Sequence, residues 1–150
     1  MSKTIVSSST LTSELAEFLS SFVYSMWHSL PLQTAVVSLK TGPSTFSHFC
    51  ESLLKNTGLS FSVVLVALKL IHRLKQNRPD LTGVEGSECR LLVCALMLSM
   101  KVLMDNTYTN RTWVKVSKIP LKEINIMEME LLVQLHFDLF VSEYEYLVWI

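Results

Sequence analysis

Apolar residues recur at helical spacing along most of this chain. Each stripe is bounded by residues that start or stop helices, such as serine, threonine, glycine and proline. Thr12 or Ser13 can cap the first helix, and Pro31 ends it. The expected helices run over 13–30, 45–57, 60–78, 87–104, 111–116 and 120–135, and residues 143–150 are expected to begin another. This pattern predicts an all-α fold.

The segment from Leu91 to Met104 differs from the other helices, because almost every position in it is apolar. A helix that is apolar on all sides is a buried helix. We therefore expect this one to be central, with the other helices packed around it.

The chain divides into three parts by composition. Residues 1–12 are rich in serine and threonine and are expected to be disordered. Residues 13–44 hold an N-terminal helix and a connection, and residues 45–150 form the main helical domain.

The overall composition indicates a large core or a surface that receives a partner. Hydrophobic residues make up 49% of the 150 residues and charged residues 17%, against about 25% charged residues in an average domain. Thirteen basic residues balance thirteen acidic ones, which disfavours binding to nucleic acid or to a membrane surface. The longest apolar run, 91–100, is well short of the ~20 residues of a membrane span.

Residues that carry catalytic or metal chemistry form no recognisable motif. The three cysteines, Cys50, Cys89 and Cys94, are odd in number and spread out, which fits reduced thiols in the cytoplasm or nucleus. The four histidines lie on different predicted helices, and no phosphate-binding loop is present. We therefore expect no catalytic residues, no metal and no cofactor.

Two charged residues invite two interpretations. Lys101 closes the apolar helix, and Glu128 lies in the last long helix. On spacing alone, a lysine whose stem reaches out to solvent and an exposed glutamate are the simpler reading. The flanking residues favour a functional one.

The stretch from Ala95 to Leu147 resembles the cyclin box, and more narrowly the fungal phosphate-signalling (Pcl) cyclins, which are related to animal cyclin Y. The pattern of that group falls on Lys101, Asp105, Tyr108 with Asn110, Trp113, Glu123 with Asn125, Glu128 and Phe137-Asp138-Leu139, preceded by Arg73. The resemblance covers residues 45–147.

This resemblance implies a single cyclin box of five helices around a buried central helix, over residues 45–150, preceded by an extra N-terminal helix. It implies a non-catalytic subunit that binds and activates a cyclin-dependent kinase of the fungal phosphate-signalling type and helps select that kinase's protein substrates. It also implies a place in the nucleus and cytoplasm. The kinase-binding residues that it implies are Lys101, Glu128, Leu98, Val102, Leu132, Phe137 and Leu139. Val102 replaces the larger aromatic residue of some cyclins.

Two other interpretations stay open. A cyclin-fold scaffold or adaptor would bind proteins without activating a kinase, but it would have no need of both Lys101 and Glu128. An unrelated helical bundle would use its apolar surface to form a homodimer.

Overall fold

The computed structural model describes residues 8–29, 45–81, 87–104, 106–142, 144, 145 and 147. Over these ranges the chain forms helices and no strand, so the all-α prediction is confirmed. The helices are α1 (Ser8–Trp27), α3 (Thr45–Thr57), α4 (Phe61–Asn77), α5 (Ser87–Leu103), α6 (Asn110–Ser117) and α7 (Leu121–Gln134).

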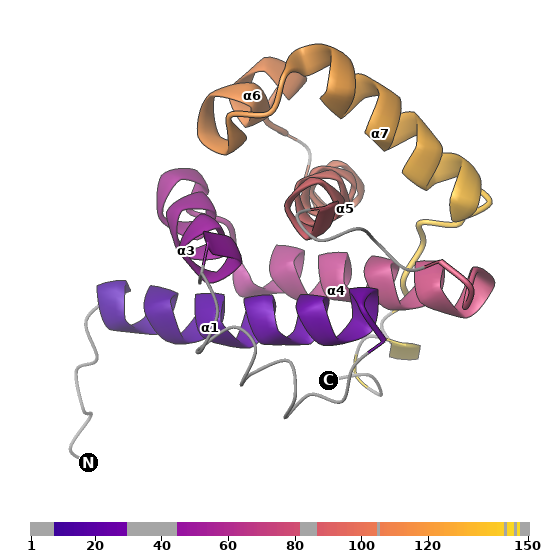
Figure 1. Cartoon of the computed structure of the whole chain (residues 1–150), viewed down its shortest axis with the longest axis horizontal. Coiled ribbons are helices and arrows are strands. Elements are labelled where there is room, and N and C mark those ends of the chain that lie inside the picture. Colours follow the sequence, from indigo (N-terminus) through magenta and orange to yellow (C-terminus); the bar gives the residue numbers. More distant parts are fainter. Residues whose placement is uncertain are drawn as a thin grey trace.

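Helix α5 is the centre of the fold, as its apolar sequence predicts. Every residue from 92 to 100 is buried, and α5 contacts each of the other described helices. Figure 1 shows α5 end-on, with α1 and α4 below it, α3 on one side, and α6 and α7 arching over it. No helix in the described ranges combines the length and the apolar composition that crossing a bilayer requires.

Local signals set several helix ends where they were expected. Gly58 follows α3 with a φ of 60°, a left-handed conformation that glycine adopts without steric cost. The Ser60 hydroxyl accepts a hydrogen bond from the Val63 amide and caps α4. Thr109 caps α6 in the same way through the Thr112 amide.

The N-terminal helix starts earlier than its sequence suggested. Helix α1 begins at Ser8 rather than near Thr12 or Ser13. The Ser13 hydroxyl does not cap the helix but donates to Glu51 Oε1 on α3, at 2.9 Å. This contact and the packing of α1 on α3 and α4 are tertiary interactions that the local sequence does not reveal. Residues 1–7 and the connection over 30–44 lie outside the described residues.

The far end of α1 is tied to the start of α5. Trp27 Nε1 donates to the Ser87 hydroxyl at 2.8 Å, and His28 Nε2 lies 3.2 Å from Glu88 Oε2. Ser87 is the first residue of α5, and its hydroxyl serves this inter-helix contact. The extra N-terminal helix is therefore anchored at both of its ends.

Candidate functional site

Lys101 and Glu128 meet at the surface although 27 positions separate them in the sequence. Lys101 lies in the last turn of α5 and Glu128 in the middle of α7. Lys101 Nζ donates to Glu128 Oε2 at 2.6 Å, and their side chains are 39% and 16% exposed. Ion pairs this close to solvent contribute about 0–1 kcal/mol to stability. The fold therefore gains little stability from the pair, which lies at the surface between two helices.

Two asparagine side chains extend this ion pair. Asn110 Oδ1 accepts from Lys101 Nζ at 3.4 Å. Asn110 Nδ2 donates to Asn125 Oδ1 at 2.7 Å. The four side chains come from α5, α6 and α7, and we call them the polar cluster: Lys101, Asn110, Asn125 and Glu128.

Two aromatic residues of the cyclin-like sequence pattern, Tyr108 and Trp113, hold the segment that leads into α6. Trp113 is fully buried, and the Tyr108 ring packs edge-on against it with centroids 6.0 Å apart. The Tyr108 hydroxyl donates to the main-chain oxygen of Thr57 at the end of α3, at 2.7 Å. These contacts fix the start of α6, and with it the position of Asn110.

The apolar side chains that were expected to surround the ion pair differ in accessibility. Val102 and Phe137 are exposed, whereas Leu132 and Leu139 are half-buried against the core. Leu98 is only 2% exposed, so a partner docking on this structure would touch it little. Leu98 therefore supports the surface from beneath.

Several exposed apolar residues on α7 and at the end of α5 were not predicted. Leu103 ends α5 and Met104 follows it, and Ile126, Met129 and Val133 form a second stripe on α7. The core stripe of α7 contains Ile124 and Leu131, and the second stripe lies on the other side of the helix. A count of apolar residues on both faces of α7 would have revealed it, because a solvent-facing stripe is normally polar.

Arg73 fastens the segment that carries Phe137 and Leu139. Its guanidinium donates to the main-chain oxygens of Asp138 and Phe140, at 2.8 and 3.1 Å, and to Glu145 at 2.9 Å. The turn just before has two consecutive left-handed residues, His136 and Phe137, with φ of 55° and 57°. Non-glycine residues rarely adopt this conformation, and it costs roughly 1–2 kcal/mol each. The strained turn directs Phe137 outward, where its side chain is 63% exposed.

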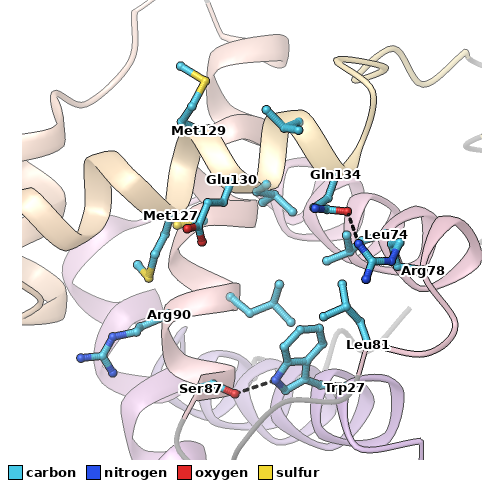
Figure 2. Close-up of a pocket in the computed structure, with 14 residues that line it drawn as sticks. Trp27, Leu74, Arg78, Leu81, Ser87, Arg90, Met127, Met129, Glu130 and Gln134 are labelled. Carbon is cyan, nitrogen blue, oxygen red and sulfur yellow. Dashed lines mark hydrogen bonds between the residues drawn. The ribbon is translucent and has the colours of Figure 1, made fainter.

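A pocket of about 640 Å³ lies on the other flank of α7. Figure 2 shows it between α7, the start of α5, the end of α4 and Trp27 of α1. Its walls are mostly apolar, and Arg78, hydrogen-bonded to Gln134 at 2.9 Å, and Glu130 lie at its edge. Four separate elements form this pocket, and nothing in the sequence pattern predicted it.

The cysteine thiols are held in their neutral form. Burial, followed by the charges of Glu128 and Glu130, raises the pKa of the pocket residue Cys94 to about 12. Burial likewise raises the pKa of Cys89 to about 11, and the pKa of the fully buried Cys50 well above its usual value. Because a thiol must ionise to act as a nucleophile, these residues behave as core side chains near neutral pH. In the described parts of the chain, no three metal-ligating side chains lie close enough to hold an ion.

Fold and site together define a class of protein: an all-α domain around a buried helix that presents a lysine–glutamate pair on a surface shared by two helices. Comparison with known proteins agrees. A family model for cyclins matches residues 6–139, so the chain belongs to the cyclin family. Cyclins are regulatory subunits of protein kinases and not enzymes themselves.

Individual relatives refine this assignment. PHO85 cyclin-5 of Saccharomyces cerevisiae is 31% identical over 106 residues, which are 67% of this chain and 46% of that protein. PHO85 cyclin-1 of the same yeast is 31% identical over 97 residues, 63% of this chain and 35% of the relative. Cyclin-U4-1 of Arabidopsis thaliana is 32% identical over 98 residues, 65% of this chain and 48% of the relative.

The likeness to the yeast proteins confirms the resemblance to Pcl-type cyclins. The chain spans about half the length, or less, of these curated relatives.

Proposed function

We propose that this cyclin binds a cyclin-dependent kinase through the surface around Lys101 and Glu128, activates that kinase and helps select its substrates. The observation that carries the proposal is the 2.6 Å contact between these two side chains, with the exposed Val102 next to Lys101 in the sequence. Two relatives are named as cyclins of PHO85, which supports a kinase of the fungal phosphate-signalling type. The excess of apolar surface supports a protein partner.

The mechanism is a shift between two states of the kinase. An active kinase needs a lysine–glutamate pair of its own, and the glutamate lies on a mobile regulatory helix. A partner that binds only the active position of that helix raises its population. Val102, Leu132 and Phe137 supply apolar contact, whereas Lys101 and Glu128 determine the register of the complex.

Calorimetric titration of purified PHO85 with this chain tests the binding. Docking of the kinase would bury this pair, and removing one partner of a hydrogen-bonded charge pair buried in an interface costs 2–5 kcal/mol or more. We therefore expect Lys101→Ala and Glu128→Ala each to weaken binding by about 30-fold or more, with melting temperatures near that of the wild type. Lys115→Ala, which removes an exposed lysine of α6, is the matched control and should bind normally.

If the two variants bind as tightly as the control, the polar cluster does not make the contact. A wild-type chain that binds neither PHO85 nor another cyclin-dependent kinase would contradict the proposal as a whole.

Location in the nucleus and cytoplasm also remains a proposal, supported by the three unpaired cysteines.

A further inference from the structure

The hydrogen bonds of the polar cluster run in a single direction. A lysine ammonium only donates hydrogen bonds, so the oxygen of the Asn110 amide must face Lys101. The nitrogen of that amide then faces Asn125 and donates to its oxygen. The nitrogen of the Asn125 amide is therefore the last donor in this series of hydrogen bonds.

The Asn125 amide nitrogen is available to a partner. Asn125 is exposed on α7, and within the described part of the chain its Nδ2 donates to no other group. Lys101 uses two of its three donors, on Glu128 and Asn110. The cluster therefore presents a row of unused N–H donors, two from Asn125 and one from Lys101.

The charges of the cluster select a neutral acceptor. Asn125 precedes Glu128 by three residues, so both lie on the same face of α7. A carboxylate or phosphate placed on Asn125 would lie close to the negative charge of Glu128, whose own cation is already paired. A main-chain carbonyl meets no such repulsion and matches a row of N–H donors.

We propose that Asn125 is a further partner-binding residue, which donates to a main-chain carbonyl of the kinase segment that Lys101 contacts. Asn110 is a positioning residue, because it orients the Asn125 amide without touching the partner. This inference rests on the proposed function and adds to it one further residue, Asn125, that donates to the kinase beside Lys101.

Titration of PHO85 with the full chain and its variants tests the contact. We expect Asn125→Ala to weaken binding roughly 2- to 10-fold, the range of one net hydrogen bond. Asn125→Asp keeps the acceptor for Asn110 but has no donor, so it should weaken binding at least as much. Asn56→Ala, which removes an exposed asparagine of α3, should change nothing, and all three variants should melt as the wild type does.

A double-mutant cycle tests the positioning role. Asn110→Ala should weaken binding more in the wild-type background than in the Asn125→Ala background, where only its contact with Lys101 remains to be lost. An equal effect in both backgrounds would overturn the role of Asn110. Normal binding by Asn125→Ala and Asn125→Asp, beside tight wild-type binding, would overturn the contact alone. A wild-type chain that binds no kinase would overturn the proposed function, and this contact with it.

Discussion

Arg73 should hold the segment after α7 in place, and its replacement by methionine removes that hold while keeping an aliphatic side chain. The Arg73 side chain is 12% exposed, and its guanidinium donates to two main-chain oxygens and the Glu145 carboxylate. A hydrogen bond to a charged group contributes about 1.5–3 kcal/mol. Part of this contribution is recovered in the variant, because water can reach the freed oxygens of exposed Asp138 and Phe140 and because the strained turn can relax. We therefore expect the free energy of unfolding to fall by about 2 kcal/mol.

Urea denaturation measures this loss, and amide hydrogen exchange locates it. In the wild type the amides of Phe137 and Asp138 donate to the main-chain oxygens of Leu132 and Leu135. These two amides should exchange faster in Arg73→Met. Arg90→Met is the matched control, because Arg90 pairs with Glu123 at 3.2 Å with both side chains 44% exposed. That variant should lose less than about 1 kcal/mol. Equal losses in the two variants, or unchanged exchange at Phe137, would refute the role of Arg73.

Three further predictions concern the fold. Leu96→Ala, in the fully buried part of α5, should lower the free energy of unfolding by about 2–5 kcal/mol, and an unchanged urea midpoint would contradict its place in the core. Burial lowers the pKa of His72, so the folded state favours its neutral form and loses stability as the pH falls below 6.5. The melting temperature should therefore drop more between pH 7.5 and 5.5 in the wild type than in His72→Gln. Equal drops in the two proteins would contradict the role of His72. His136→Gly should raise stability by about 0.5–1 kcal/mol, because glycine adopts a φ of 55° freely; a lower melting temperature would count against strain in this turn.

Features that depend on local sequence were predicted well. The ranges expected for α3 and α4, 45–57 and 60–78, lie within one residue of the observed ends, where Gly58 and Ser60 act as local stop and cap. The central position of α5 follows from its apolar composition. The start of α1 was placed wrongly, because the Ser13 hydroxyl bonds a residue 38 positions away.

Features that depend on distant residues were only partly predictable. Lys101 and Glu128 were singled out together by a family resemblance, since spacing within one helix cannot show that α5 and α7 bring them into contact. Leu98 was expected both in the buried helix and among the kinase-binding residues. Because α5 is apolar on every side, the sequence does not distinguish its covered positions from its exposed ones. The strained turn at Phe137 needs the hold of Arg73 from another helix.

Kinase activity tests the central claim most directly. Phosphorylation of a peptide by purified PHO85 is measured as this chain is added, beside the Lys101→Ala/Glu128→Ala double variant. The account predicts saturable stimulation by the wild-type chain, and stimulation by the double variant only at concentrations at least tenfold higher, if at all. Binding of the wild-type chain without any rise in phosphorylation would contradict activation and would indicate an adaptor instead.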